Sequence, residues 1–325
     1  MVFRMGIVGF ISLIIGICIG FFMFGKSEKS APILNCSDDY HFINESLGCK
    51  PSQAIRKGLY TELTLELEEY IKSQNVKGNS NLVSIYFRDF GGGPTFGINT
   101  EEFFAPASLL KVPLLVSILS LVEDNPKLLE EHTSYQTLNT NLTQTTDVPT
   151  LEPNTLYSVK ELMERMIIYS DNVSFWLLQD YLDKKYPDKF IVSDTMKELG
   201  LISPRTGDEK TITVRGYASI FRQLYNASYI SPEMSELALG IMARSTYSKG
   251  LVAGVPRDFR VAHKFGELGL PGGEKQLHDC GIIYFPKNPY LLCIMTKGTD
   301  SEKLTKIIQS IATMVYKEVN SRKIY

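Results

Sequence analysis

The sequence predicts an α/β (α+β) fold. An antiparallel sheet is flanked by terminal helices, an all-helical region is inserted between its strands, and one N-terminal transmembrane helix precedes it. Three observations predict this class. Residues 5–24 carry no charge, strand-like segments fall in two groups at 81–98 and 259–296, and the chain between these groups has helical spacing. Further helical segments precede the first group and close the chain.

The composition excludes several classes of protein. The chain has 325 residues, of which 44% are apolar and 22% are charged, as in ordinary globular proteins and unlike disordered chains or multi-span transporters. Its net charge of −2 offers no basic excess for a phosphate backbone, so no nucleic-acid partner is expected. The four histidines are scattered, without H-E-x-x-H or C-x-x-C motifs. No metal site and no cofactor are predicted.

The uncharged stretch Met5–Phe24 lies between Arg4 and Lys26. Twenty apolar residues span about 30 Å as a helix, the thickness of a bilayer core. The alternative is a cleaved signal peptide, but bulky residues end the stretch and no A-x-A cleavage pattern follows. We therefore expect a signal-anchor over residues 1–25. Arg4 favours a cytoplasmic N-terminus, although lysines also follow the span, and the expected location is the cell membrane, single-pass, with the folded domain extracytoplasmic.

Residues 26–52 are polar and irregular, which indicates an extracytoplasmic tether. Cys36 and Cys49 lie within it and could pair in an exported compartment, the alternative being two free thiols. Cys280 and Cys293 lie in apolar runs and are expected as buried thiols.

The first elements of the domain follow from spacing. Leucine and isoleucine recur every four residues between Leu59 and Ile71, which predicts a helix over 53–73. Residues 81–90 alternate and are rich in β-branched and aromatic side chains, which predicts a strand. Gly91 to Pro94 then form a turn into a partner strand at 95–98. The glycines do not form a phosphate-binding loop, because G-K-[ST] is absent.

The remaining elements follow in order. Residues 105–122 are predicted to be an apolar helix, 131–153 a long loop and 158–182 a second helix, with Ser158 as its N-cap and Glu161 three residues later. The later elements are helices at 213–225 and 231–243, strands at 259–265, 276–285 and 290–296, and a closing helix at 301–319. Residues 53–325 thus form one domain, expected to be monomeric, with its helical region at about 105–212.

Three short motifs occur in an informative order. They are Ser108-Leu109-Leu110-Lys111, Ser170-Asp171-Asn172 and Lys264-Phe265-Gly266. Each alone is weak evidence, because Ser and Lys are common. A serine and a lysine three residues apart share a helix face, so the amine can reach the hydroxyl. A serine hydroxyl becomes a good nucleophile only when a base takes its proton.

The set resembles the S-x-x-K, S-D-N and K-T-G motifs of the class A β-lactamase and penicillin-binding protein superfamily of serine hydrolases. The resemblance extends over residues 55–320 and includes the segment Phe104–Pro113 and the hairpin after Leu82. It implies a β-lactamase/transpeptidase-like fold and a catalytic domain that faces the cell wall. It also implies acylation of Ser108 by β-lactams or D-alanyl-D-alanine-type peptides, followed by hydrolysis of the acyl-enzyme.

The catalytic residues implied are Ser108, Lys111, Ser170 and Lys264. Lys111 would act as base if burial and the neighbouring Lys264 cation depress its pKa. Ser170 would relay a proton to the departing nitrogen. Asp171 is expected to hold its own loop together.

The substrate-binding residues implied are Asn172, Gly266 and Glu267. Asn172 would donate to a substrate amide carbonyl and contact Lys111. By resemblance, the oxyanion hole would consist of the backbone N–H groups of Ser108 and Glu267, the latter directly after Gly266.

The chain departs from the family pattern in two places. Phe265 replaces a hydroxyl residue that helps hold a substrate carboxylate. The Glu267 carboxylate either repels anionic substrates, selects amine-bearing ones, or points to solvent. The segment 201–210 is short and lacks the E-x-x-L-N motif whose Glu activates the deacylating water. Its acids, Asp208 and Glu209, are expected to belong to a solvated helix start. The alternatives are therefore a D,D-peptidase-like protein with slow deacylation and a non-turnover ligand-binding sensor.

Overall fold

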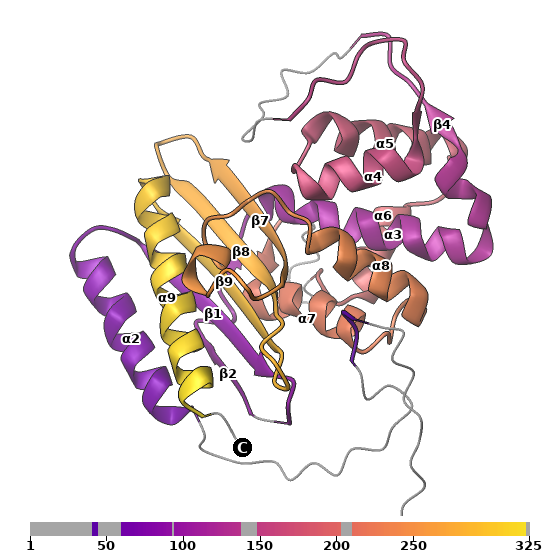
Figure 1. Cartoon of the computed structure of the whole chain (residues 1–325). Helices are drawn as coiled ribbons and strands as arrows, with labels where there is room; N and C mark the ends of the chain where they lie inside the picture. The colour runs from indigo at the N-terminus through magenta and orange to yellow at the C-terminus, as the bar shows by residue number, and fades with distance from the viewer. Residues whose placement is uncertain (1–40, 45–59, 93, 138–147, 203–209, 323–325) are drawn as a thin grey trace, which may run out of the picture. The chain divides into compact units, whose positions relative to one another are not determined.

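The computed structural model describes residues 41–44, 60–92, 94–137, 148–202 and 210–322. A five-stranded sheet in the order β2-β1-β9-β8-β7 forms the centre of this part of the chain (Figure 1). Its strands are β1 (Leu82–Asp89), β2 (Thr95–Ile98), β7 (Val261–Gly269), β8 (Lys275–Ile283) and β9 (Tyr290–Gly298). All neighbouring strands are antiparallel, so the predicted sheet is confirmed, with β7 as one edge.

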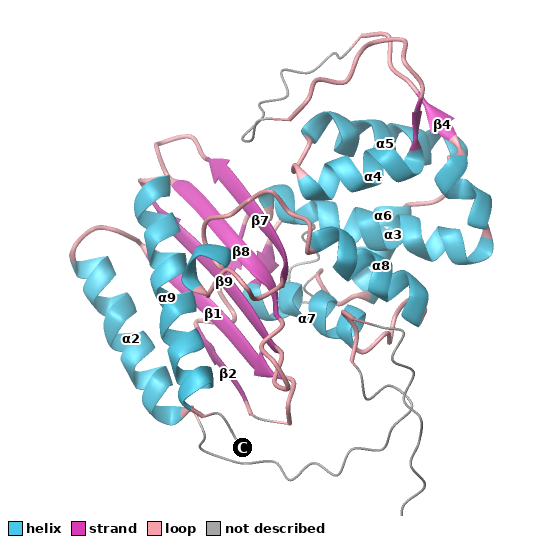
Figure 2. Ribbon diagram, in the orientation of Figure 1, coloured by secondary structure: helices cyan, strands magenta, loops and turns pink. Residues whose placement is uncertain are grey.

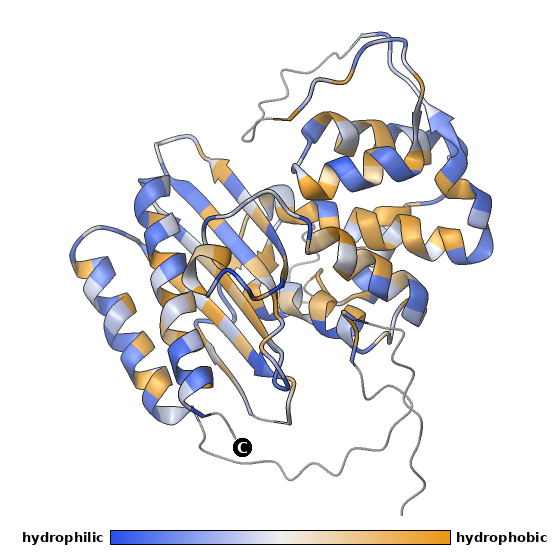
Figure 3. Cartoon of the chain, viewed as in Figure 1, coloured by the Kyte–Doolittle hydropathy of each residue, from blue (hydrophilic) through white to orange (hydrophobic). Residues whose placement is uncertain are grey.

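Two terminal helices, α2 (Thr61–Val76) and α9 (Ser301–Ser321), cover one face of the sheet (Figure 1). Most of their apolar residues pack toward the sheet and hydrophilic residues lie on their outer faces (Figure 3), although Leu65 and Val76 of α2 are exposed. Asp300 caps α9, because its carboxylate accepts the N–H groups of Glu302 and Lys303. Leu67 of α2 and Ile308 of α9 are fully buried in one cluster with alternate residues of β1 and β9. This alternation leaves the other residues of each strand for the opposite face.

The opposite face packs against the inserted helices (Figure 2). These are α3 (Lys111–Asp124), α4 (Val159–Ile168), α5 (Asn172–Lys185), α6 (Ile191–Glu198), α7 (Val214–Tyr225) and α8 (Pro232–Met242). The shorter elements are the 3-10 helices η1 (Ala107–Leu110), η2 (Pro126–Glu130) and η3 (Val252–Gly254) and the strands β3 (Phe103–Phe104), β4 (His132–Thr133), β5 (Tyr157–Ser158) and β6 (Ile212–Thr213). The insertion therefore extends beyond residue 212, since α7 and α8 share its core.

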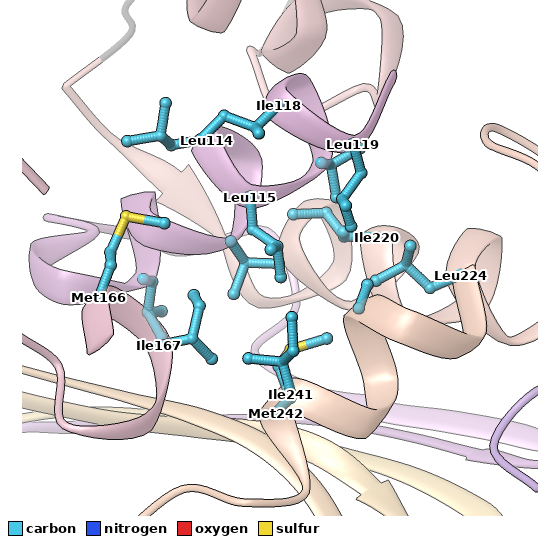
Figure 4. Packing of buried hydrophobic residues seen from close by; sticks show 14 of the residues in the cluster. Leu114, Leu115, Ile118, Leu119, Met166, Ile167, Ile220, Leu224, Ile241 and Met242 are labelled. Carbon is cyan, nitrogen blue, oxygen red and sulfur yellow. The ribbon is translucent and has the colours of Figure 1, made fainter. Parts of the chain in front are cut away.

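Helix α3 is the central helix of this second core. Residues 111–119 of α3 are all buried, as expected for a helix that is apolar on every side. Figure 4 shows Leu115 and Leu119 of α3 among side chains of α4, α7 and α8. The surrounding helices fix α3 in position, and with it the lysine at its first residue.

The single helix predicted over 158–182 is wrong. Ser158 does cap α4, with its Oγ accepting the N–H of Glu161 at 3.1 Å, as the sequence indicates. However, α4 ends at Ile168, and α5 begins at Asn172 with Asp171 as its N-cap. Ser170 lies in the break with a φ of 56°, a left-handed conformation that no helix continues through. Helix α6 is not among the predicted elements.

A short segment from the expected tether, residues 41–44, lies on the domain. The carboxylate of Glu236 in α8 accepts the backbone N–H groups of His41, Phe42 and Ile43 at 2.7, 2.8 and 3.0 Å. The Ile43 side chain is buried, and the hydroxyl of Tyr284 donates to the carbonyl of Phe42. This part of the chain is therefore part of the folded domain and not a free tether.

The cysteines of the sheet differ from the expectation. Cys280 of β8 and Cys293 of β9 are buried, as predicted, but they are register partners and form a disulfide. The expectation of two free thiols is therefore wrong.

Among the described residues, every helix is too short or too polar to cross a bilayer. The predicted span 5–24 lies outside the described residues, as do Cys36 and Cys49.

Candidate active site

The turn that carries Ser108 is held on both sides by buried side chains. In β8, the side-chain oxygen of Gln276 accepts the N–H of Ala105 at 3.0 Å, and His278 Nε2 donates to the Ala105 carbonyl at 3.0 Å. The hydroxyl of Tyr217 donates to the carbonyl of Leu109 at 3.0 Å. Ser108, between these anchors, remains partly exposed. The nucleophile candidate is therefore rigidly placed and still accessible.

Burial lowers the pKa of His278 to about 4, so its imidazole is neutral at ordinary pH. The N–H of Thr296 approaches its Nδ1 at 3.4 Å and can only donate, which leaves the proton on Nε2 for the Ala105 carbonyl. The sequence pattern does not predict the roles of Gln276, His278 and Tyr217, because each binds a backbone group more than 100 residues away in the chain.

Lys111 is at the centre of the predicted set. Its Nζ lies 2.9 Å from Ser108 Oγ, 2.8 Å from the Ser170 carbonyl, 3.2 Å from Ser170 Oγ and 2.5 Å from Asn172 Oδ1. The Lys111 side chain is only 2% exposed. The structure therefore brings the first two motifs together, although they are some 60 residues apart.

The third motif meets the other two at Ser170. Lys264 Nζ donates to Ser170 Oγ at 2.9 Å and to the carbonyl of Phe265 at 2.7 Å. Lys264 is fully buried. A continuous chain of contacts thus runs from Ser108 through Lys111 and Ser170 to Lys264.

The two amines have perturbed pKa values. Burial lowers the pKa of Lys111 to about 7, although the charge of Asp171 opposes the shift. Burial, with repulsion from Lys111 in addition, lowers the pKa of Lys264 well below its ordinary value. The amines titrate as a coupled pair, so the site does not readily hold two full positive charges. Lys264 is therefore a weaker fixed cation than the sequence suggests.

Asp171 holds the loop, as predicted. Its carboxylate accepts the N–H of Val173 at 2.9 Å, the hydroxyl of Ser174 at 2.8 Å and Arg165 Nε at 3.2 Å. These contacts cap α5 and fix Ser170 in its left-handed conformation.

Gly266 lies where β7 passes the nucleophile turn. A Cβ on Gly266 would lie 3.1 Å from both the Pro106 carbonyl oxygen and the Leu109 nitrogen. Glycine therefore permits the close approach of the edge strand to the turn. Glu267 follows Gly266 and is partly exposed. The oxyanion hole implied for the backbone N–H groups of Ser108 and Glu267 stays a prediction. Asp208 and Glu209 lie outside the described residues.

Comparison with known proteins agrees with this geometry. Residues 66–319 match the model of the family described as "Beta-lactamase enzyme family". The chain belongs to the beta-lactamase enzyme family. It is a serine hydrolase by this membership. No curated protein matches the chain.

Solved structures share the fold of this family member at low identity. A point mutant of PBP-A, in an acyl-enzyme complex with penicillin G, is 22% identical with a TM-score of 0.68, covering 84% of this chain and 100% of that one. A beta-lactamase from Xanthomonas campestris is 20% identical with a TM-score of 0.66, covering 78% and 97%. One from Chitinophaga pinensis is 19% identical with a TM-score of 0.66, covering 78% and 100%.

Proposed function

We propose that this family member is a membrane-anchored active-site serine hydrolase. Ser108 is acylated by β-lactams or D-alanyl-D-alanine-type peptides, and water then hydrolyses the acyl-enzyme. The observation that carries the proposal is the 2.9 Å contact between Lys111 Nζ and Ser108 Oγ, made by an amine whose pKa burial lowers to about 7.

The contacts of Lys111 indicate how it acts as a base. A neutral amine has two N–H groups and one lone pair. The Ser170 carbonyl and Asn172 Oδ1 can only accept, so they take the two N–H groups. The lone pair is then left for the hydroxyl proton of Ser108. As the bond from Ser108 Oγ to the substrate carbonyl carbon forms, that proton moves to Lys111 Nζ.

Collapse of the intermediate breaks the C–N bond of the substrate. The proton held by Lys111 passes through the Ser170 hydroxyl to the departing nitrogen, which restores the neutral amine. Ser170 Oγ suits this relay, because it contacts both Lys111 and Lys264. The backbone N–H groups of Ser108 and Glu267 stabilise the developing oxyanion in this mechanism.

Labelling with a fluorescent penicillin tests the proposal. A covalent adduct on Ser108, located by intact-mass and peptide mass spectrometry, is expected, and Ser108→Ala should abolish it. The acyl-enzyme complex with penicillin G described for the PBP-A mutant supports penicillin as the probe. A label that persists in Ser108→Ala would contradict the assignment.

A second candidate is a protein of the same fold that is acylated and then releases product very slowly, or only senses the ligand. The lack of an E-x-x-L-N motif between Gly200 and Thr211 favours slow release. The rate at which the label leaves Ser108 separates these candidates, since a hydrolase recovers free serine and a sensor does not.

The anchor is the remaining part of the proposal, and the uncharged residues 5–24 support it. The full-length protein is expected in the membrane fraction at uncleaved mass, with its domain open to external protease after removal of the cell wall. A chain lacking residues 1–25 provides the control and should be soluble. A shortened, soluble form of the full-length protein would contradict the anchor.

A further inference from the structure

The wall of the site beside Lys264 is aromatic. The rings of Phe265 and Tyr247 are stacked, with centroids 3.9 Å apart and planes inclined by 12°. Lys264 Nζ lies 4.2 Å from the centroid of the Phe265 ring. Phe265 is only 3% exposed, whereas Tyr247 is partly exposed and covers it. The face presented next to Lys264 is therefore apolar and offers no hydroxyl from residue 265.

This wall lies on the leaving-group side of the reaction. Ser170 Oγ is the proposed donor to the departing nitrogen, and Lys264 Nζ is 2.9 Å beyond it. A substituent on the carbon next to that nitrogen therefore extends toward Lys264 and the aromatic pair. In penicillins and in D-alanyl-D-alanine peptides this substituent is a free carboxylate.

The charges around the wall do not favour a carboxylate. Asp279 is the register partner of Phe265, so both side chains lie on the same face of the sheet. It is fully buried, and its carboxylate accepts His263 Nδ1 at 2.8 Å and the N–H of Leu251 at 2.9 Å. Glu267 adds a second carboxylate two residues along β7, on the partly exposed side.

Asp279 also packs against the loop that carries Tyr247. A Cβ on Gly250 would lie 2.5 Å from Asp279 Oδ2 and 3.4 Å from Tyr247 Cε1. Gly250 has a φ of 59°, so both its backbone conformation and the lack of room for a Cβ beside Asp279 require glycine here. The loop from Tyr247 to Leu251 is thereby packed directly onto the buried carboxylate.

The amine of Lys264 is already engaged. Its donors point to Ser170 Oγ and the Phe265 carbonyl, and its remaining surface faces an aromatic ring. In the described loop before β7, Arg244 pairs with Glu164 at 3.2 Å, and Lys249, Arg257 and Arg260 are exposed. Lys249 is the nearest of these to Tyr247 in the sequence, so it is the competing candidate for a carboxylate anchor and is included in the test.

From this geometry we infer that the enzyme selects substrates whose leaving group carries no free carboxylate. Tyr247, backed by the buried Phe265, offers a partly exposed aromatic surface that suits a neutral amide or ester at this position. The inference rests on the proposed function, because it names the substrate class of the same site. The carboxylate that Phe265 would exclude is the group that a hydroxyl at its position would bind.

The test compares benzylpenicillin with its methyl ester, which share one acyl group and differ in the anion. The rate of adduct formation at Ser108 is followed by intact-mass spectrometry on the full chain. The wild-type protein is expected to react at least as fast with the ester as with the acid. Phe265→Thr should shift the ester-to-acid ratio toward the acid by about tenfold. Phe265→Leu, which restores no hydroxyl, should leave the ratio near the wild-type value.

Each outcome has a distinct meaning. If neither compound labels Ser108, the proposed function fails. If Ser108 is labelled and the acid reacts faster than the ester, the proposed function stands and the inference is overturned. Loss of that acid preference in Lys249→Ala would assign the anchor to Lys249. The wild-type ratio alone decides the inference, so it remains testable if a Phe265 variant does not fold.

Discussion

Lys111 and Lys264 contact the same oxygen atom, Ser170 Oγ, at 3.2 and 2.9 Å. Only one of the two contacts Ser108 Oγ in the structure, and that is Lys111 at 2.9 Å. Both amines are buried, and their different contacts separate their proposed roles.

Lys111→Arg should reduce acylation of Ser108 by at least about 100-fold, because a guanidinium keeps its proton and cannot act as a base. Lys264→Arg is the matched control, since it retains a donor for Ser170, and it should keep measurable acylation. Time courses of adduct formation with a penicillin compare the two. An equal loss in both variants would contradict the separate roles.

The rate of acylation should rise with pH around neutrality. Below a pKa of about 7, Lys111 is an ammonium without a lone pair, so the rate is expected to fall by about tenfold per pH unit. Above that pKa the rate should level off. In Lys264→Arg, a permanent neighbouring charge should move the midpoint to lower pH. A rate that does not change across this range of pH would exclude Lys111 as the base.

Ser170→Gly should be more stable than Ser170→Ala by about 1 kcal/mol, because only glycine adopts the φ of 56° without steric cost. Both variants lack the hydroxyl and should lose acylation rate alike. Urea unfolding gives the stability difference. Ala107→Gly tests the same effect beside the nucleophile, where φ is 50°. An alanine variant as stable as the glycine variant would show that the loop is not strained.

His278 should make the domain acid-sensitive. Its pKa is lowered from 6.5 to about 4 in the fold, so the unfolded chain binds the proton first as pH falls. The contribution of neutral His278 to the free energy of unfolding is therefore complete above pH 6.5. It declines by about 3 kcal/mol as the pH falls toward 4. His278→Gln keeps an N–H donor and lacks this titration. Its stability deficit relative to wild type should shrink as pH falls, and a constant deficit would contradict the prediction.

Deacylation should be the slow step with β-lactams. Rapid mixing with a chromogenic β-lactam is expected to give a burst close to one equivalent and then a slow steady state, because the family's deacylating Glu is missing. Fast turnover without a burst would refute this. In that case Asp208→Asn and Glu209→Gln would show whether either acid replaces it.

The sequence predicts the sheet and its terminal helices from alternation and helical spacing, which are local properties. The meeting of the three motifs joins residues 59 and 94 positions apart, and it is implied by the family resemblance and not by spacing. The break at Ser170 is not predicted, because the apolar spacing continues through it and serine is not a usual residue for positive φ. The disulfide is not predicted either, because pairing Cys280 with Cys293 requires the register of β8 and β9, which spacing alone does not define.

The contacts that hold Ala105, and the stacking of Tyr247 on Phe265, are also beyond prediction from the sequence. Gln276 and His278 are polar residues in a strand, and nothing in the neighbouring sequence indicates that their side chains bind the backbone of Ala105. Phe265 is visible as a departure from the motif, but its partner comes from a loop that has no motif of its own.

The binding of residues 41–44 to Glu236 shortens the linker between the proposed membrane anchor and the domain. If residues 5–24 are the anchor, only about 16 residues separate bilayer and domain, and a fully extended chain of that length spans on the order of 60 Å. Ser108 is then confined to a layer above the membrane whose thickness is set by the linker length. Within that layer, the effective concentration of the enzyme depends on the linker length and not on its abundance. Glu236→Gln, which weakens the binding of residues 41–44, would lengthen the linker without changing the active site.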